Sequence, residues 1–255
     1  MSAIERQRLL DFLEETLQPQ RFADYCPNGL QVEGAPRVDR VLCAVTASLA
    51  VLQEAARQGA QMVLVHHGWF WRGEDARVLG VRRARLAAAL AHQINLVAYH
   101  LPLDVHPELG NNIQLARALG WPDGEAFGRD GLLRIADLGE PQGRAWDADR
   151  LASCLREGLA REPLLVGDLA RPIRRVAWCT GAAQDSLEAA IEAGADAYVS
   201  GEISERTTHL AREAGVIYAS AGHHATERFG VQALGQRLRD TFGVQVGFFD
   251  DPNPV

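Results

Sequence analysis

The chain has 255 residues, of which 47% are hydrophobic, so it can bury a sizeable core as one large domain or two closely joined ones. Its net charge is −7 and its basic residues are dispersed, which argues against nucleic acid as a partner. No hydrophobic run approaches the ~18 residues of a membrane-spanning helix, and the four cysteines are widely spaced without a C-x-x-C motif. We therefore expect a cytoplasmic protein with reduced thiols and no membrane partner.

The first half of the chain, residues 1–120, predicts alternating helices and strands. Its opening, MSAIERQRLLDFLEETL, has the pattern of an amphipathic charged helix rather than a signal peptide. From Arg40 to Gly68 the sequence predicts a strand, a helix with Ala and Leu on one face, a Gly-Ala break at Gly59 and a second strand. Residues 94–104 predict the passage from a second helix into a third strand. This half is therefore expected to be β-α-β-α-β.

The middle of the chain, residues 121–170, predicts a strand at GLLRIADLG, a helix at DADRLASCLREGLA with an aspartate cap, and a strand at PLLVGD. Because it separates two similar halves, we expect it to be a short α+β insertion or smaller subdomain.

The second half, residues 171–255, repeats the pattern of the first. A shift of 135 positions places Arg40 over Arg175 without a gap, and Gly194 then falls at the place of Gly59. Residues 216–227 repeat the third-strand exit. We expect an α/β fold in which the duplicated halves pack as one unit and form mixed sheets flanked by helices, with strand C-termini gathered at one edge.

Histidines and carboxylates cluster at these predicted strand ends. His66 and His67 close the second strand, and His100 follows the third, with Asp104 four residues later. In the second half, His223 and His224 follow the matching strand, with Glu227 four residues after His223. Imidazole and carboxylate together suit zinc, iron, manganese or nickel. The pattern predicts a metal centre.

The spacing favours two ions rather than one. Neighbouring residues on a strand point to opposite faces, so His66 and His67 would each address a different ion. His223 and Glu227 would share one face of a helix, and the Glu227 carboxylate could bridge two ions. Asp104 would complete the shell of one ion and His223 that of the other. Five protein ligands for two ions leave positions for water, as in a catalytic site.

Other residues allow two interpretations. His92 and His209 on helical faces, and His106 in a turn, are expected to be ordinary surface or core residues. Trp69 and Trp71 could stack on a heterocyclic substrate or pack in an oligomer interface. A non-enzymatic protein that stores or delivers metal, or acts as a scaffold for partners, is the alternative to an enzyme.

The candidate ligands lie within longer motifs, and these motifs resemble the NIF-three-like dinuclear-metal-centre proteins of bacteria, commonly labelled type-two GTP cyclohydrolase I homologues. The resemblance extends from Asp24 to the closing DPNP. The motifs that carry it are DYCPNGLQVEG, VHHGWFW, HLPLDVHPELGNN, WCTGAAQD, SGEISERT and AGHHATERFG.

The resemblance implies a duplicated α/β fold, two divalent metal ions per chain and a toroidal homohexamer. The ligands it implies are His66, His67, Asp104, His223 and the bridging Glu227. His100 also matches the family pattern, which implies a role as a proton shuttle or as a residue that orients a ligand. Tyr25 and Asn28 match a loop of the family that lines the substrate pocket. We therefore expect a metal-dependent hydrolase that acts on a small-molecule substrate, either a nucleotide or a small phosphorylated or heterocyclic compound.

Overall fold

The computed structural model describes residues 3–139 and 145–255, and the chain divides into two compact units. Unit 1 comprises Met1–Leu109 and Gly230–Pro252, and unit 2 comprises Gly110–Phe229 and Asn253–Val255. The chain thus leaves unit 1, completes most of unit 2 and returns. Helix α10 (Arg228–Phe242) contains the point of return. These bounds differ from the expected division at residues 120 and 170, because the C-terminal helix and strand belong with the N-terminal half.

Unit 1 is built on a sheet with the strand order β13-β4-β5-β6-β2. The first four strands run parallel, and β2 is antiparallel to β6. A separate pair joins β1 and β3. The strands are β1 (Ile4–Glu5), β2 (Gly29–Val32), β3 (Arg37–Val38), β4 (Arg40–Thr46), β5 (Met62–His67), β6 (Asn95–Ala98) and β13 (Gln245–Phe248).

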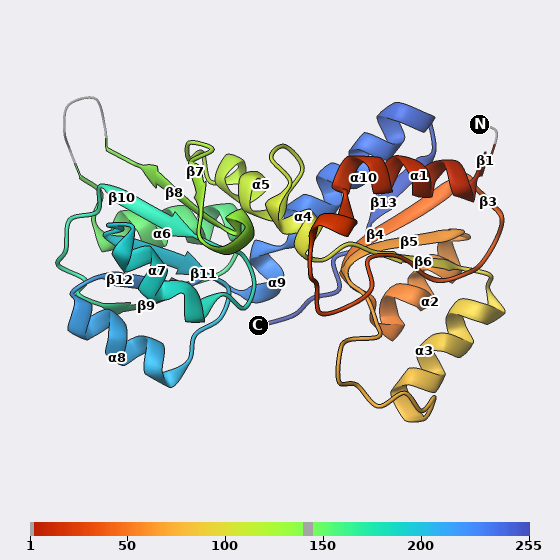
Figure 1. Ribbon diagram of the computed structural model, residues 1–255, viewed down its shortest axis with the longest axis horizontal. Coiled ribbons are helices and arrows are strands. Elements are labelled where there is room, and N and C mark those ends of the chain that lie inside the picture. Colours follow the sequence, from red (N-terminus) through yellow and green to blue (C-terminus); the bar gives the residue numbers. More distant parts are fainter. Residues whose placement is uncertain (1–2, 140–144) are drawn as a thin grey trace. The chain divides into compact units, whose positions relative to one another are not determined.

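Helices cover both faces of the unit 1 sheet (Figure 1). Cys43 and Leu64 pack under α1 (Arg6–Leu17) and α10, whereas their strand neighbours Leu42 and Val63 pack under α2 (Leu49–Gln58) and α3 (Gly80–Ala91). Strand residues alternate between faces, so the hydrophobic runs of β4 and β5 supply both cores. A short helix, α4 (Leu101–Val105), follows β6.

Unit 2 has a mixed sheet with the strand order β7-β8-β10-β11-β12-β9. Strands β10, β11 and β12 run parallel, and the outer strands β8 and β9 are antiparallel to β10 and β12. The strands are β7 (Glu125–Phe127), β8 (Leu133–Asp137), β9 (Leu164–Gly167), β10 (Arg175–Trp178), β11 (Ala197–Ser200) and β12 (Ile217–Ser220).

The helices of unit 2 also pack on both faces of its sheet (Figure 1). Leu155 and Trp178 belong to the core under α5 and α6, and Leu187 and Tyr198 to the core under α7 and α8. The helices are α5 (Asn111–Ala118), α6 (Ala148–Leu159), α7 (Leu187–Glu192), α8 (Glu205–Ala214) and α9 (His223–Thr226). A mixed α/β fold with helices on both faces of its sheets agrees with the fold class expected from the sequence.

The strand, helix and strand expected in the middle segment form as β8, α6 and β9, and Asp147 caps α6 by accepting from the Arg150 N–H. They do not form a separate insertion. β8 and β9 instead pair with the outer edges of the parallel strands, so the middle segment completes the second sheet.

The internal repeat is visible in the hydrogen-bond register. Val41 pairs with Met62 in unit 1, and the residues 135 positions later, Val176 and Ala197, pair in unit 2. Gly59 and Gly194 both end a helix with positive φ, at 66° and 78°. The repeat predicted from residue patterns is thus present in the backbone.

The offset of 135 positions between corresponding residues changes at the third parallel strand of each unit, β6 and β12. The Tyr99 N–H donates to Val65 O, and the Ala221 N–H donates to Ser200 O. By this register His100 corresponds to Gly222, so His223 lies one residue further along than a strict repeat would place it.

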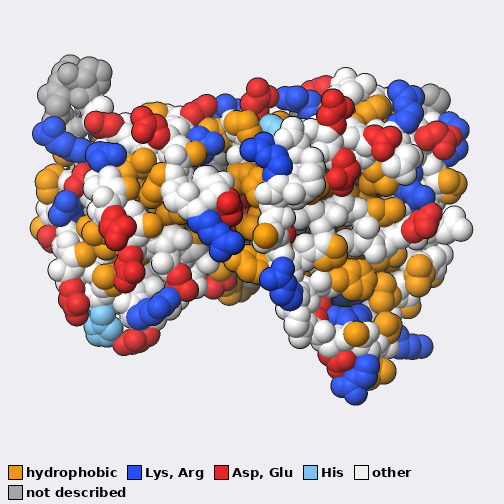
Figure 2. Space-filling view, viewed as in Figure 1, with side chains coloured by type: hydrophobic (Ala, Val, Ile, Leu, Met, Phe, Trp, Pro, Cys, Tyr) orange, Lys and Arg blue, Asp and Glu red, His pale blue; other side chains and the backbone are white. Residues whose placement is uncertain are grey.

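The charge distribution and the helices both agree with what the composition predicts. On the face shown in Figure 2, acidic and basic side chains are interspersed rather than gathered by sign. Among the described residues, no helix combines the length and hydrophobicity needed to cross a bilayer.

Candidate metal centre

In unit 1, three imidazoles gather where β5 and β6 end. The ring centroids of His66 and His67 are 4.5 Å apart, and that of His100 lies 5.0 Å from His66 and 5.7 Å from His67. One potential ligand atom from each ring lies within 4.8 Å of the other two. His66 is fully buried, and His67 and His100 are partly exposed. These distances suit coordination of a cation by several imidazoles.

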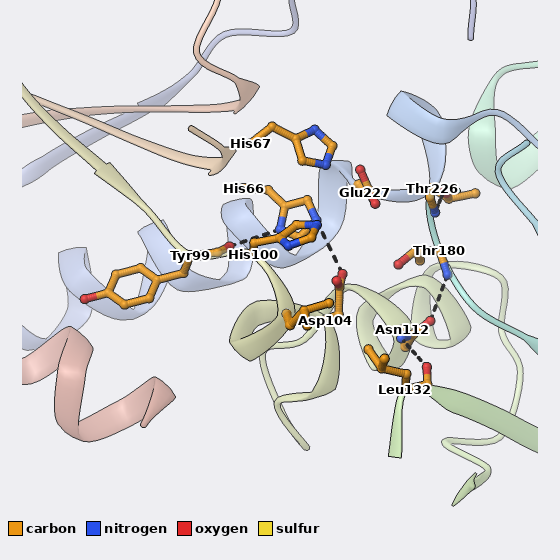
Figure 3. Close-up of polar contacts among 12 residues, drawn as sticks. His66, His67, Tyr99, His100, Asp104, Asn112, Leu132, Thr180, Thr226 and Glu227 are labelled. Atoms are coloured by element: carbon orange, nitrogen blue, oxygen red, sulfur yellow. Dashed lines mark hydrogen bonds and ion pairs between the residues drawn. The ribbon is translucent and has the colours of Figure 1, made fainter. Parts of the chain in front are cut away.

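The neighbouring strands hold the two adjacent histidines. His66 Nδ1 donates to the Tyr99 carbonyl at the end of β6, 3.0 Å away, as Figure 3 shows. His67 Nδ1 lies 3.1 Å from Thr46 Oγ1 at the end of β4. The rings are therefore anchored on opposite sides of β5, and their centroids lie only 4.5 Å apart.

His100 is held by the carboxylate of Asp24, a residue that was not among the candidates predicted from the sequence. Asp24 Oδ1 accepts from His100 Nδ1 at 2.7 Å, and Asp24 Oδ2 accepts from the Leu101 N–H at 2.9 Å. The same carboxylate accepts from the Tyr25 N–H and from the Asn28 amide. The Asp24 side chain is only 3% exposed, so this loop is fastened to the start of α4.

These bonds keep Asp24 ionised. Burial alone would raise its pKa, but the hydrogen bond and charge attraction of His100, with the Asn28 and Tyr25 donors, outweigh burial and lower the pKa to about 2. At neutral pH the carboxylate therefore acts only as an acceptor.

Asp104 places a second buried carboxylate in unit 1. It lies on α4, is 7% exposed, and its Oδ1 is 3.5 Å from His66 Nε2 (Figure 3). Because His66 Nδ1 is engaged by Tyr99, Nε2 is the nitrogen through which His66 would coordinate an ion, beside Asp104.

Unit 2 carries the other predicted pair. His223 Nε2 lies 3.1 Å from Glu227 Oε2, and His223 Nδ1 lies 2.6 Å from Glu202 Oε1. Helix α9 ends at Thr226, and Glu227 leaves the helical conformation with φ −103° before α10 begins. The predicted four-residue spacing thus brings His223 and Glu227 together across one helical turn.

The two carboxylates favour the charged imidazole in the absence of metal. Burial alone would lower the pKa of His223, but the hydrogen bonds and charges of Glu227 and Glu202 outweigh it and raise the pKa to about 9. Glu227 is only 3% exposed, so the pair concentrates negative charge in a mostly buried place. Such a place suits a divalent cation.

Two glycines, Gly181 and Gly201, make room for this pair at the ends of the parallel strands. The Gly201 N–H donates to Gly181 O at 2.8 Å, and the Gly222 N–H donates to Gly201 O at 2.9 Å. A Cβ at Gly181 would lie 2.1 Å from Glu227 Oε1, and one at Gly201 would lie 2.6 Å from His223 Cα. Glycine is required because a Cβ would clash with the Glu227 side chain at Gly181 and with the His223 backbone at Gly201.

The residues expected to line a substrate pocket lie near His100. The Tyr25 ring, 53% exposed, is centred 6.3 Å from the His100 ring, and the Trp71 ring is centred 5.0 Å from it. Asn28 accepts from the His100 N–H through its side-chain oxygen, so its amide helps to hold the loop. Trp69 is buried, and its indole N–H donates to Ala47 O, which places it in the core and not beside a substrate.

The other histidines behave as expected. His92 is exposed at the end of α3, and His209 is exposed on α8, bonded to Glu205. His106 Nδ1 accepts from the backbone N–H groups of Glu108 and Leu109 and so stabilises a turn. None of the three belongs to a candidate metal-ligand group found among residues 3–139 and 145–255.

Comparison with known proteins gives the family. Residues 4–254 match the family model described as Duf34/NIF3 (NGG1p interacting factor 3). The chain belongs to the Duf34/NIF3 family. A relative in Pseudomonas aeruginosa named GTP cyclohydrolase 1 type 2 homolog is 50% identical over 256 residues, covering 99% of this chain and 100% of the relative. A relative of the same name in Escherichia coli K12 is 45% identical over 254 residues, with 99% and 100% covered.

Several solved structures share the fold of this chain. A protein titled ybgI, of unknown function, superimposes with a TM-score of 0.92 at 44% identity, covering 99% of this chain and 100% of that one. TTHA1606 from Thermus thermophilus gives a TM-score of 0.85 at 32% identity, with 99% and 100% covered. Reduced HcgD from Methanocaldococcus jannaschii, at 20% identity and a TM-score of 0.85, shows likeness of fold alone.

Within each unit the donor set fits a divalent cation. Imidazole nitrogens and carboxylate oxygens are ligands for zinc, iron, manganese and nickel, and the bonds to Nδ1 already orient the rings. The groups that make those bonds, among them Asp24 and Glu202, were not among the candidates predicted from the sequence. Both lie inside the motifs DYCPNGLQVEG and SGEISERT, which were the available signal.

Proposed function

We propose that this Duf34/NIF3 protein is a metal-dependent hydrolase with two divalent cations per chain. The ligands in this proposal are His66, His67 and Asp104 from unit 1, with His223 and the bridging Glu227 from unit 2. The observation that carries it is the group of His66, His67 and His100, whose potential ligand atoms lie within 4.8 Å of one another. Imidazoles gathered in this way at the ends of neighbouring strands are typical of an open α/β ligand site.

The chemistry follows from the donor count. Five protein ligands leave positions for water, and two bound cations would supply an activated water and stabilise negative charge at the attacked atom. Asp24 holds His100 at Nδ1, so His100 would hold or transfer a proton at Nε2. A site that only stored or delivered metal, the alternative function, would be more completely enclosed by protein ligands.

The substrate we propose is a nucleotide or another small phosphorylated or heterocyclic compound. The relatives' name, GTP cyclohydrolase 1 type 2 homolog, points toward a purine nucleotide. Tyr25 and Trp71 lie beside His100 and offer aromatic faces on which a planar ring could stack.

We also propose that the protein assembles into a toroidal homohexamer. Hydrophobic side chains on and before α3 support an interface between copies, because Leu79 is 62% exposed and Val81 is 67% exposed. The exposed Phe70 and Leu90 add to this hydrophobic surface of unit 1.

Metal content tests the proposal most directly. Elemental analysis of protein purified without chelator is expected to find about two divalent ions per chain, because five ligands and bound water can fill two coordination shells. The His92→Ala variant should keep the same content, since His92 is exposed at the end of α3. Protein that stays metal-free after incubation with zinc, manganese and iron would contradict the proposal.

Activity is tested with a panel of nucleotides and phosphoesters. The metal-loaded protein is expected to hydrolyse at least one member, and removal of metal by a chelator should abolish the reaction because the cations activate the water. The matched control is Glu227→Ala treated with the same metal. Full metal occupancy with no turnover on any member would favour the storage or scaffold alternative.

A further inference from the structure

Each unit bonds one imidazole of the proposed centre to a carboxylate that is not among the proposed ligands. In unit 1, Asp24 accepts from His100 Nδ1 at 2.7 Å. In unit 2, Glu202 accepts from His223 Nδ1 at 2.6 Å. A carboxylate accepts and never donates when ionised, so both bonds require the proton on Nδ1. Nε2 is then the nitrogen that His223 would offer to a cation and that His100 would use to hold or transfer a proton.

The internal repeat gives Glu202 a particular place. The register that pairs Val41 with Met62 and Val176 with Ala197 makes Glu202 the counterpart of His67, 135 positions earlier. In unit 1 this position carries a proposed ligand whose ring lies 5.7 Å from that of His100. In unit 2 the same position carries a carboxylate bonded to His223. At this position of the repeat, His67 in unit 1 is itself a proposed ligand, whereas Glu202 in unit 2 orients the ring of a proposed ligand, His223.

We propose that Asp24 and Glu202 are positioning residues that fix the Nδ1–H tautomers of His100 and His223, so that His223 offers Nε2 to a divalent cation and His100 keeps Nε2 for proton transfer. This inference rests on the proposed function for the identity of the ligand, but the bonds themselves exist without metal. Carboxylates in this relation to metal-bound histidine commonly contribute roughly 10–100-fold to affinity.

The two carboxylates have different hydrogen-bond partners, and these partners determine which substitutions can test each residue. Both oxygens of Asp24 accept from donors, namely His100 Nδ1, the Asn28 amide and the N–H groups of Tyr25 and Leu101. In Asp24→Asn, the NH2 group of the new asparagine would face at least one of these donors, and the hydrogen bond to that donor would be lost. Glu202 faces His223 through one oxygen, so Glu202→Gln can still accept whereas Glu202→Met cannot.

The first measurement is the tautomer of each ring, by NMR of protein labelled with 15N in histidine. At a pH above the His223 pKa of about 9, where its ring is neutral, we expect Nδ1 protonated and Nε2 unprotonated in both rings of metal-free wild type. Asp24→Asn should abolish that state for His100 alone and Glu202→Met for His223 alone, while Glu202→Gln should retain it. Unchanged ring signals in Asp24→Asn and Glu202→Met would overturn the proposal.

The second measurement is zinc affinity by calorimetric titration. Glu202→Met is expected to bind zinc about 10–100-fold more weakly, and Glu202→Gln should recover most of the loss. Asp24→Asn should keep its zinc affinity, because His100 is not among the proposed ligands. The matched control is Glu205→Met, which removes an equivalent 2.7 Å carboxylate–imidazole bond to His209 on the exposed face of α8. It should leave affinity unchanged.

The two measurements separate the inference from the proposed function. An altered His223 tautomer with unchanged zinc affinity in Glu202→Met would refute the positioning role toward metal even if the protein binds zinc. Wild type that binds no zinc would refute the proposed function, and the ring signals would still decide whether the carboxylates fix the tautomers.

Discussion

Replacing Glu227 with alanine is expected to remove both metal ions while the chain stays folded. The carboxylate is 3% exposed, and its Oε2 lies 3.1 Å from His223 Nε2. A bridging carboxylate binds both ions, so its loss should weaken binding by more than the ~100-fold that loss of an orienting partner can cause. Metal content after dialysis, with circular dichroism as the test of folding, measures the effect.

The control for this variant is Glu213→Ala, an exposed glutamate on α8. It should retain full metal content. If Glu227→Ala also kept both ions, the bridging role would be refuted. If it lost only one, Glu227 would be a ligand to a single ion.

Gly181→Ala should weaken metal binding, as Glu227→Ala should, although it replaces none of the proposed ligand residues. The added Cβ would lie 2.1 Å from Glu227 Oε1 and 3.2 Å from His223 Nε2, so the carboxylate must move. We expect zinc affinity to fall on the order of 100-fold, as for loss of a supporting group. The φ of +68° adds a backbone cost of about 1–2 kcal/mol in the free energy of unfolding.

A second glycine separates these two effects. Gly215 ends α8 with φ +63°, and a Cβ there would meet nothing within 4 Å. Gly215→Ala should therefore lose about 1–2 kcal/mol of stability, measured by urea unfolding, and keep its zinc affinity. Equal loss of affinity in both variants would show that general destabilisation, and not displacement of Glu227, explains the result.

Much of the fold could be predicted because the same pattern of hydrophobic strands, helices and glycines occurs in both halves of the sequence. The Gly59 and Gly194 caps and the hydrophobic strands beside them have the same register in both units. The assignment of β7, β8 and β9 to the second sheet could not be predicted, because strand pairing is set by long-range edges and not by local residue patterns. For the same reason the sequence did not reveal that β13 pairs with β4 in unit 1.

The candidate ligands could be chosen from the sequence because histidines and carboxylates recur at corresponding predicted strand ends of a duplicated chain. The structure confirms the proximity of His66, His67 and His100 within unit 1 and of His223 and Glu227 within unit 2. Joint binding of two ions by these groups stays a prediction.

The carboxylates that hold the rings could not be found in the same way. Asp24 bonds to a residue 76 positions away and Glu202 to one 21 positions away, and nothing local marks either pairing. Trp69 and Trp71 illustrate the same limit. They are two residues apart in one motif, yet Trp69 is a core residue whereas Trp71 lies beside His100.

The return of the chain to unit 1 has a consequence for synthesis on the ribosome. Unit 1 needs Gly230–Pro252 to be complete, whereas all of unit 2 except its last three residues lies in the uninterrupted segment before them. Translation from the N-terminus therefore finishes most of the second unit while β4 still lacks its neighbour β13. During that interval the nascent chain exposes an unpaired strand edge and the hydrophobic surface that α10 later covers, which makes this the stage most vulnerable to aggregation.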